Sequence, residues 1–600
     1  MTEEWRTPPA YEPVRGRTVW LSCLALVLAV AAAVAAQGLT AIIALVTNAA
    51  FYGRLSTAFV APGGGTHRPL VLLLTPMAGA LAVGLMARYG SSAIRGHGIP
   101  EVMEKVLFGE SRISARVLFL KPLSAAIAIG TGGPFGAEGP IIATGGALGS
   151  LAGQFLHVTA DERKVLLAAG AAAGMSATFG SPVSAVLLAV ELLLFEYRPR
   201  SIIPVALASA TATAVRIAFV GAAPAFPIPL LAQPRGSALA VYTLLGLIMG
   251  VVAAGITRAS YAIEDGYERL GHRFGVHWMW WPIAGALVVG VVGLVEPRTL
   301  GVGYDNIVAA LAGSLTGRAL LLLAILKFIS WSCYLGSGTS GGTLAPLFTI
   351  GSGIGATAGA AIASVAPALG VDARIAGLVG MAAIFAGASH ALLASIVFAF
   401  ETTRQPVGLL PLLGACTAAY LSSLLVSRNS IMTEKLARRG VSVQTEYAVD
   451  HLSQVRVGDV ATRAVVTLPA EETLASVRAR LAAGGDGATH QGFPVVDASG
   501  ALVGVVTRRD LVDVASGDAL AVRQVVRRAP VVVHEDNTLR DVADVMVLEH
   551  VGRVPVIASD GSRRVVGIVS RSDLLAAHAP RLRAAHRVAR SRRVWTFGSR

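Results

Sequence analysis

Charge is scarce in this chain. Only 14% of its 600 residues are Asp, Glu, Lys or Arg, whereas 54% are hydrophobic and the mean hydropathy is +0.64. Soluble domains carry about a quarter charged residues, so the composition excludes an ordinary soluble protein. The scarcity is uneven, because residues 18–50 and 69–86 are almost uncharged while the sequence after Ser427 is rich in Arg, Asp and Glu. We therefore expect one part of the chain in lipid and a later part in water.

Cysteine is also scarce, and no cluster of catalytic or metal-binding residues stands out. Cys23, Cys333 and Cys416 lie far apart in apolar runs, which excludes a disulfide framework and a thiolate metal site. The sequence has neither a nucleophile elbow nor a phosphate loop that ends in Lys-Ser/Thr. We expect no enzyme, no catalytic or metal centre and no required cofactor. The net charge of +14 is better explained by Lys and Arg on the cytoplasmic side of a membrane than by a nucleic-acid partner.

Long and short apolar stretches alternate from residue 18 to about residue 430. The first stretch, 18–50, exceeds the core of a signal peptide and can span a bilayer with tilt. The preceding segment, 1–17, is expected inside the cell. Several later stretches are shorter than the roughly 20 residues of a straight span. The pattern predicts a multi-pass protein of the plasma (inner) membrane, with short, tilted or re-entrant helices in the lipid bilayer.

Two motifs recur at one offset. Residues 136–140 (Gly-Ala-Glu-Gly-Pro) are echoed by 342–346 (Gly-Thr-Leu-Ala-Pro), and residues 174–179 by 380–385, in both cases 206 residues later. A shared offset indicates a duplicated half, with halves at about 18–235 and 236–430. Each half has Gly and Pro inside apolar sequence, which membranes tolerate only where the freed backbone lines a site or cavity. A transporter built from broken helices is predicted.

Three turns have the composition of an anion site. They are residues 96–101 (Gly-His-Gly-Ile-Pro-Glu), 136–140 and 342–346. A bare anion in a low-dielectric medium carries a desolvation penalty of the order of tens of kcal/mol. Free amides at helix N-termini, with about half a positive charge per helix, compensate that penalty without a trapping cation. Because proline fits the first helical turn, Pro100, Pro140 and Pro346 are predicted to mark helix starts that point at one anion.

The three turns, in this order, resemble the signature loops of the CLC family of chloride channels and proton–chloride antiporters. The resemblance extends over essentially the whole chain. It implies an α-helical membrane domain over 18–430, built as an inverted repeat of tilted and broken helices, in a homodimer with one pore per subunit. It also implies that Glu138 is the gating glutamate, whose carboxylate competes with the anion. The residues that it places at the anion site are His97, Gly98, Ala137, Gly139, Thr343, Leu344 and Met432.

The chain departs from the usual family residues at this site. His97 stands where Ser is common, and it either donates to the anion or is a hydrogen-bonded structural residue. Ala137 replaces a basic residue, which leaves Lys121 as the charge of the pore vestibule. Leu344 and Met432 replace an aromatic residue and the pore tyrosine, and a thioether has no O–H to donate. Only the amides of the third turn therefore carry over as ligands there.

The residues on the predicted proton route distinguish passive anion conduction from proton-coupled antiport. Family members that exchange protons usually have an inner glutamate directly after the one matched here by Glu191, but this chain has Leu192. Glu196 is a substitute, although the following Tyr-Arg-Pro-Arg indicates a salt-bridged membrane exit, and Glu191 is expected to be structural. The sequence thus predicts passive, gated conduction of chloride or a similar small anion, with proton-coupled antiport as the alternative. A cation transporter or membrane sensor is disfavoured, because the membrane region has few of the carboxylates that divalent cations require.

A soluble module is predicted after Met432, and it is doubled. Residues 493–496 with 504–511 are matched by 554–557 with 567–574, each with the pattern of strand, turn and helix. The pattern resembles a cytoplasmic pair of α+β CBS domains at 455–516 and 517–579, between a linker (431–454) and a basic tail (580–600). The resemblance implies an adenine nucleotide (ATP, ADP or AMP), and a purely structural pair is the alternative. The implied ribose positions are Thr507, Asp510, Ser570 and Asp573.

Overall fold

The computed structural model describes residues 16–440, 450–484, 487–513 and 517–579. These residues form two compact units, which we call the membrane unit (16–440) and the C-terminal unit (450–579). The predicted tail 580–600, most of the predicted N-terminal segment and residues 441–449 of the predicted linker lie outside the described residues.

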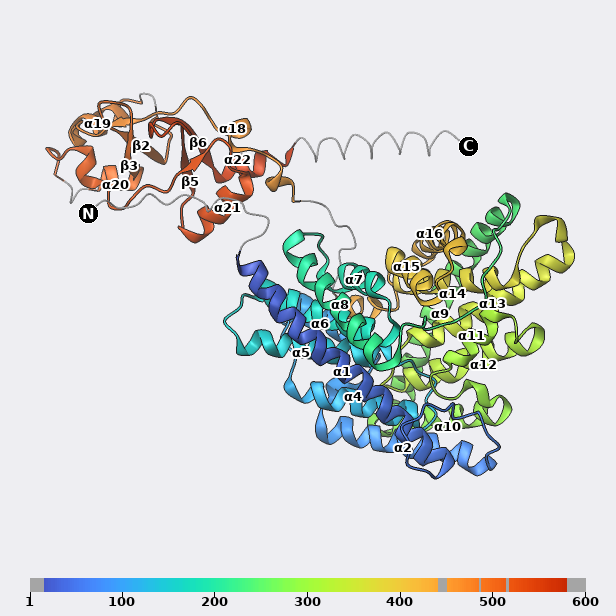
Figure 1. Ribbon diagram of the computed structural model, residues 1–600. Helices are drawn as coiled ribbons and strands as arrows, with labels where there is room; N and C mark the ends of the chain where they lie inside the picture. Colours follow the sequence, from blue (N-terminus) through green and yellow to red (C-terminus); the bar gives the residue numbers. More distant parts are fainter. Residues whose placement is uncertain (1–15, 441–449, 485–486, 514–516, 580–600) are drawn as a thin grey trace. The chain divides into compact units, whose positions relative to one another are not determined.

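The membrane unit is helical throughout (Figure 1). Its first half contains α1 Gly16–Tyr52, α2 Pro69–Leu85, α3 Ile99–Phe108, α4 Ala115–Gly130, α5 Glu138–Phe155, α6 Ala160–Phe179, α7 Pro182–Ala189, the π-helical segment η3 Val190–Leu194 and α8 Pro199–Val220. Its second half contains α9 Gly236–Phe274, α10 Trp281–Val295, α11 Tyr304–Ala312, α12 Gly317–Gly336, α13 Leu344–Val365, α14 Ala373–Ser389, α15 Leu392–Thr403 and α16 Leu409–Val426, followed by the short α17 Glu434–Ala437.

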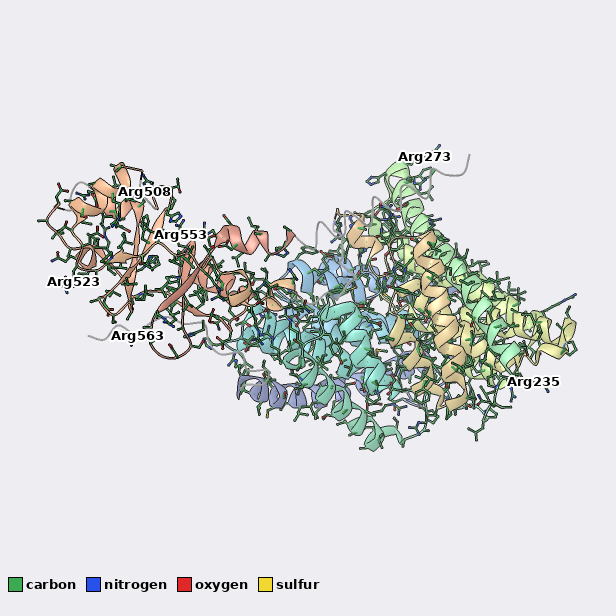
Figure 2. The ribbon with its side chains drawn as sticks, turned by 90° about the horizontal axis from the view of Figure 1, so that it is seen from above. Arg235, Arg273, Arg508, Arg523, Arg553 and Arg563 are labelled. Atoms are coloured by element: carbon green, nitrogen blue, oxygen red, sulfur yellow. The ribbon has the colours of Figure 1, made fainter. Side chains whose placement is uncertain are left out.

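The surface of this unit suits lipid. Within the described ranges, eight helices are long and apolar enough to cross a membrane. Large apolar side chains are exposed along them, such as Val27 on α1, Ile248 on α9 and Leu425 on α16, which water would disfavour. The 39 residues of α9 correspond to about 58 Å of helix, longer than a hydrocarbon core of about 30 Å. Arg235 and Arg273 stand at its opposite ends (Figure 2).

The duplication is visible as two equivalent helix pairs. Helix α5 packs against α6, and α13 packs against α14. A Cβ atom on Gly145 would lie 2.1 Å from the Gly170 carbonyl oxygen, and one on Gly351, 206 residues later, would lie 2.5 Å from that of Gly380. Membrane helices approach this closely only through small residues. The halves also contact each other, because α2 packs against α10 and α7 against α15.

Pro100, Pro140 and Pro346 lie in the first turns of α3, α5 and α13. Pro100 is the second residue of α3. Helices α5 and α13 begin at Glu138 and Leu344, two residues before Pro140 and Pro346. All three prolines therefore lie in the first turn of a helix, at its second or third residue. The whole first turn accommodates proline because its amides have no partner within the helix.

The C-terminal unit contains two sheets of the same design. Each has a parallel first pair and an antiparallel second pair of strands, in the order β1-β2-β3 and β4-β5-β6. The strands are β1 Leu468–Pro469, β2 Gly492–Val496, β3 Leu502–Thr507, β4 Val533–His534, β5 Arg553–Ile557 and β6 Val565–Ser570. The helices are α18 Val457–Val460, α19 Leu474–Ala482, α20 Arg508–Val512, α21 Leu539–Leu548 and α22 Arg571–Ala576. Each sheet has its own apolar core, so the predicted strand–turn–helix repeat is present twice.

Candidate anion site

The three turns are joined by backbone hydrogen bonds. Gly96 N donates to the carbonyl oxygen of Thr339 (2.9 Å), three residues before the third turn. Gly342 N donates to the carbonyl oxygen of Gly136 (3.0 Å), which ties the third turn to the second. The starts of α3, α5 and α13 therefore meet at one place, although they are up to about 250 residues apart in the chain.

The first and second turns touch backbone to backbone. Gly98 has a φ of +95°, and a Cβ atom there would lie 2.5 Å from the Gly139 carbonyl oxygen. A Cβ atom on Gly139 would lie 2.0 Å from the His97 carbonyl oxygen. Any larger residue at either position would push the turns apart, so glycine is required for this close approach.

The first backbone amides of these three helices have no hydrogen-bond partner within the helix. In each of α3, α5 and α13 the first ladder bond comes from the fourth residue after the cap, namely Val102 N to Gly98 O, Ile141 N to Ala137 O and Leu347 N to Thr343 O. Earlier amides are free of the ladder, and the positive end of the helix dipole adds to them. The amide of Gly98 is an exception, because it donates to Oε2 of Glu101 (2.8 Å). The anion-binding role predicted for Gly98 therefore competes with an internal carboxylate.

The Glu138 carboxylate lies among these turns and is fully buried. Its Oε1 accepts a hydrogen bond from the Tyr304 hydroxyl (2.9 Å). Its Oε2 has no hydrogen-bond partner among the described residues, and a Cβ on Gly136 would lie 1.6 Å from it. The Ala345 amide, in the first turn of α13, also faces this carboxylate. A carboxylate thus occupies the space between the second and third turns, where a free anion would meet the same amides.

The other predicted ligands are buried around the same turns. His97 Nδ1 and Thr343 Oγ1 are enclosed polar atoms without a hydrogen-bond partner in the described part of the chain. Ala137, Leu344 and Met432 are also buried and contribute no side-chain donor. Among the predicted ligands that the structure describes, the imidazole and the threonine hydroxyl are therefore the side-chain groups available to an anion beside the backbone amides.

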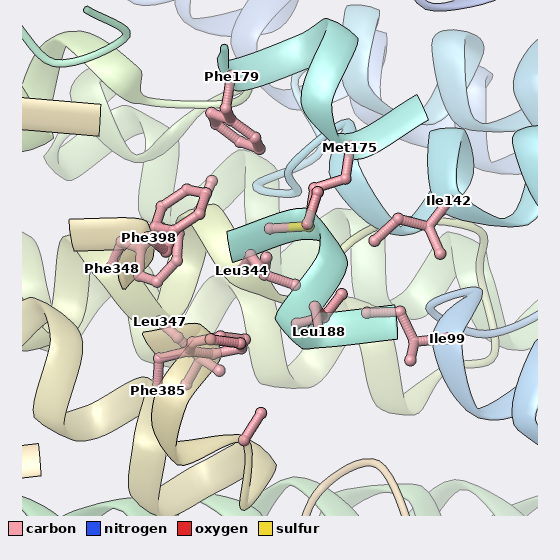
Figure 3. Packing of buried hydrophobic residues seen from close by; sticks show 14 of the residues in the cluster. Ile99, Ile142, Met175, Phe179, Leu188, Leu344, Leu347, Phe348, Phe385 and Phe398 are labelled. Carbon is pink, nitrogen blue, oxygen red and sulfur yellow. The ribbon is translucent and has the colours of Figure 1, made fainter. Parts of the chain in front are cut away.

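Apolar side chains enclose these turns (Figure 3). Ile99 at the start of α3 and Leu344 at the start of α13 belong to one buried cluster with Ile142 of α5. In the same cluster the rings of Phe348 and Phe398 stack with centroids 4.8 Å apart. Because such walls offer no hydrogen bonds, an anion here would be solvated mainly by the amides of the turns.

The sequence predicts that Lys121 is the charge of the pore vestibule. The structure contradicts this prediction, because Lys121 does not lie in an open vestibule. Its side chain is buried, and Nζ donates to the carbonyl oxygens of Ile94 (2.8 Å) and Gly96 (2.7 Å). Lys327, 206 residues later, is buried in the same way and donates to Thr299 O (2.9 Å) and Gly301 O (2.8 Å). Each lysine therefore fastens the backbone of one turn in its own half.

The turn held by Lys327 is a fourth turn, which sequence reasoning misses. It comprises residues 301–304 (Gly-Val-Gly-Tyr), and Gly301 N donates to the Gly132 carbonyl oxygen (3.0 Å). It matches residues 96–99 at an offset of 205 and lacks the proline that marks the other three. The repeat offset of 206 leads from Lys121 to Lys327, and an offset one residue shorter leads from the first turn to the fourth. Its last residue, Tyr304, begins α11 and donates to Glu138.

Two glutamates, Glu191 and Glu401, connect the two halves of the membrane unit by hydrogen bonds away from the four turns. The Glu191 carboxylate accepts hydrogen bonds from the amides of Leu393 and Ala394 (both 3.0 Å) at the start of α15. The Glu401 carboxylate accepts from two amides at the start of α7 (3.0 and 2.9 Å). These are reciprocal helix caps between halves, and they give Glu191 the structural contacts expected from the sequence.

The remaining positions of the predicted proton route are less suited to carry protons. Leu192 is buried in the apolar core within η3. The Glu196 carboxylate accepts from the Ser201 hydroxyl (2.6 Å) and lies 3.8 Å from Lys164 Nζ and 3.6 Å from Arg198 Nε. Glu196 thus has the ion pairs of a residue at the membrane exit.

The predicted ribose positions form two capping boxes. Oδ2 of Asp510 accepts from the amide (2.9 Å) and hydroxyl (2.6 Å) of Thr507 at the start of α20. Oδ2 of Asp573 accepts from the amide (2.7 Å) and hydroxyl (2.8 Å) of Ser570 at the start of α22. These bonds stabilise the two helix starts and leave the other carboxylate oxygen of each Asp outside the box.

The inverted repeat and the amide-lined turns define a membrane protein for anion transport. Residues 78–424 match the family model described as voltage gated chloride channel, and residues 457–517 and 522–579 each match the CBS domain model. Because the first match covers more than half of the chain, this protein belongs to the CLC family and carries a pair of CBS domains. The family and fold class predicted from the sequence are confirmed.

Individual relatives agree with this assignment. The chain is 29% identical over 390 residues to the H(+)/Cl(-) exchange transporter ClcA of Salmonella arizonae, covering 64% of this chain and 82% of the relative. It is 29% identical over 385 residues to the ClcA protein of Salmonella newport, covering 63% and 81%.

Solved structures show the same fold. A slow cyanobacterial Cl-/H+ antiporter superimposes with a TM-score of 0.62 at 22% identity, covering 71% of this chain and 98% of that one. A eukaryotic CLC transporter gives 0.59 at 21% identity, covering 92% and 98%. A CLC-type fluoride/proton antiporter gives 0.57 at 22% identity, covering 70% and 98%.

Proposed function

We propose that this protein exchanges protons for chloride, or for a similar small anion, across the membrane. The observation that carries the proposal is the buried Glu138 carboxylate among the amides of the second and third turns. The curated relatives bear the name of H(+)/Cl(-) exchange transporters, which favours exchange over the passive conduction predicted from the sequence. Both functions use the same fold and the same glutamate.

The exchange follows from competition for one set of donors. An ionised Glu138 and a free anion both require the amides at the starts of α5 and α13, and two like charges at one site repel each other. Protonation removes the charge of the carboxylate and releases it, so the anion enters. When the proton leaves, the carboxylate returns and displaces the anion. Each turnover thus couples proton binding and release at Glu138 to anion entry and exit, and the proposed exchange requires that proton and anion cross the membrane in opposite directions.

The anion is recognised chiefly by size and by amide donors. Leu344 and Met432 supply apolar walls, while His97 and Thr343 supply the two buried polar atoms described above. A selectivity series with chloride, bromide, nitrate and fluoride tests this assignment. We expect small, weakly basic anions to be transported best, because the walls offer no compensation for a larger or more strongly hydrated ion.

A flux assay in liposomes tests the exchange. The full-length protein is reconstituted, a chloride gradient is imposed with the membrane potential clamped, and external pH is followed with an electrode. Proton movement against its own gradient, driven by chloride, is the expected result. The Glu138→Gln variant is the control, since it retains the shape of the side chain but cannot ionise.

Gated passive conduction is the second candidate. Leu192, buried in the apolar core, favours it, because a leucine cannot relay a proton from the inner side. Chloride flux without any proton movement in the same assay would select this candidate.

We also propose that the CBS pair is cytoplasmic and binds an adenine nucleotide that controls transport. The oxygens left outside the capping boxes of Asp510 and Asp573 are the candidate partners of a ribose. Calorimetry of the full-length protein with ATP, ADP and AMP tests it, with Asp510→Asn and Asp573→Asn as variants. Heat that is reduced in the variants is expected, and no heat with any nucleotide would leave the pair a scaffolding role.

The protein is further proposed to be a homodimer with one pore per subunit in the plasma (inner) membrane. Its apolar helices and its family support this assembly. Light scattering of the purified protein with the detergent contribution subtracted should give the mass of two chains, and the mass of one chain would contradict the proposal.

A further inference from the structure

Tyr304 brings a hydroxyl from the second half of the membrane unit to the gate of the first half. Its hydroxyl donates to Glu138 Oε1 (2.9 Å), and the amide of Ala137 faces the phenolic oxygen. The ring lies in an aromatic cluster, with centroid distances of 5.8 Å to Phe179 and 5.9 Å to Phe226. Because the ring is packed on two sides, the position of its phenolic oxygen is restricted.

We propose that Tyr304 is a positioning residue that latches the Glu138 carboxylate in its blocking position. The bond from a hydroxyl to an ionised carboxylate is stronger than the bond to a neutral carboxyl group. The latch is therefore strong while Glu138 is charged and seated, and it weakens when Glu138 is protonated. This inference rests on the proposed function, because it presupposes that Glu138 is the gate.

The other groups that face Glu138 are independent of the phenol. Lys327 of α12 is the cation that acts on the carboxylate, and its Nζ is held by the carbonyl oxygens of Thr299 and Gly301. The Ala345 amide of α13 faces the carboxylate from the third turn. Replacing Tyr304 by phenylalanine therefore removes one donor and leaves the cation and the amide in place.

The latch exists on one side of the repeat only. The first-half position that matches Tyr304, at the offset of 205, is Ile99, which begins α3 and has no hydrogen-bonding side chain. A phenylalanine would fill the aromatic cluster equally well, so the hydroxyl is the group that packing does not require. The Tyr304 hydroxyl donates to the buried Glu138 carboxylate between the second and third turns.

Anion flux of Tyr304→Phe as a function of pH tests the latch. Losing a hydrogen bond to a charged group corresponds to about a tenfold change in the gate equilibrium. We expect flux at a pH where the wild-type gate is mostly shut to rise about tenfold, and the pH of half-maximal flux to move up by about one unit. An unchanged pH profile would overturn the proposal.

Tyr242→Phe is the matched control. Tyr242 is fully buried, and its hydroxyl accepts a hydrogen bond from the Asp372 amide (2.9 Å), away from the anion turns. This variant also loses a buried hydroxyl, so its unfolding temperature should fall while its pH profile stays that of the wild type. An equal shift of the pH profile would show that loss of any buried hydroxyl alters flux, and would overturn the latch.

A double-mutant cycle separates the latch from the gate. In a Glu138→Ala background, Tyr304→Phe should leave flux unchanged, because the hydroxyl has lost its partner. If Tyr304→Phe alters flux as much in that background, the phenol acts elsewhere and the latch is refuted. If Glu138→Ala by itself changes neither flux nor pH dependence, the gate of the proposed function fails instead.

Discussion

The two halves of the membrane unit share a skeleton and differ in their chemistry. Both have a helix pair closed by glycines and a buried lysine on two carbonyl oxygens. At the position 206 residues after Glu138, however, the second half has Leu344, and at the position that matches Tyr304 the first half has Ile99. The carboxylate of the proposed gate, Glu138, thus comes from one half and its hydrogen-bond donor, Tyr304, from the other. Duplication accounts for the amide-lined scaffold, and divergence at two positions accounts for the contact between Glu138 and Tyr304.

The largest effect is expected from replacing Glu138, and no such effect is expected at Leu344, the matching position in the second half. Glu138→Gln should reduce chloride-driven proton movement by at least about 100-fold, because a positioned proton-transfer group is lost. Anion flux should remain and lose its pH dependence. The measurement is the liposome assay with a pH electrode.

The matched change in the second half is Leu344→Met, which nearly conserves side-chain volume. It should keep the ratio of protons to anions. If it abolished proton movement as Glu138→Gln does, the two positions would not differ in function.

Replacing either buried lysine is expected to lower the unfolding free energy by the same amount, but only one replacement should change the pH dependence of flux. Lys121→Met or Lys327→Met leaves two carbonyl oxygens without a charged donor, which costs about 3 kcal/mol of unfolding free energy. Only Lys327 faces Glu138, so only Lys327→Met should move the flux profile to higher pH, since a cation no longer stabilises the ionised carboxylate.

Thermal unfolding in detergent and the pH profile of flux measure these two properties separately. An equal shift of the pH profile in Lys121→Met would contradict the asymmetry between the halves.

Removing either of the two reciprocal helix caps should have the same effect on unfolding free energy and on transport. Glu191→Gln and Glu401→Gln each remove the charge of a carboxylate that caps a helix of the other half, at a cost of about 1 kcal/mol. Neither variant should change the ratio of protons to anions. A selective loss of proton movement in Glu191→Gln would instead place that residue on the proton route.

The smallest effect is expected in the C-terminal unit, which is also duplicated, so that its two CBS domains can be compared in the same way as the two halves of the membrane unit. Thr507→Ala and Ser570→Ala remove equivalent capping hydroxyls, so each should lower the unfolding free energy of this unit by about 0.5–1 kcal/mol. Chemical denaturation followed by circular dichroism measures the change. A loss confined to one variant would show that the two CBS domains have diverged.

Several features could be predicted from the sequence because their signals are local. The three Gly/Pro turns, the acidic residue inside one of them and the 206-residue offset all lie in short stretches. The change from apolar to charged composition likewise separates the membrane unit from the C-terminal unit. Pro140 and Pro346 lie in the first turns of α5 and α13, where proline is tolerated because the amides have no partner within the helix.

The sequence alone therefore determined the membrane class, the duplication and the candidate gate at Glu138. Only the tertiary structure decided which donors were already engaged, as for the Gly98 amide on Glu101, and that Lys121 is buried against backbone oxygens. It also decided the partner of Glu138, because Tyr304 is 166 residues away in the chain. Such contacts depend on how the two halves fold against each other, and no local pattern of residue types records that arrangement.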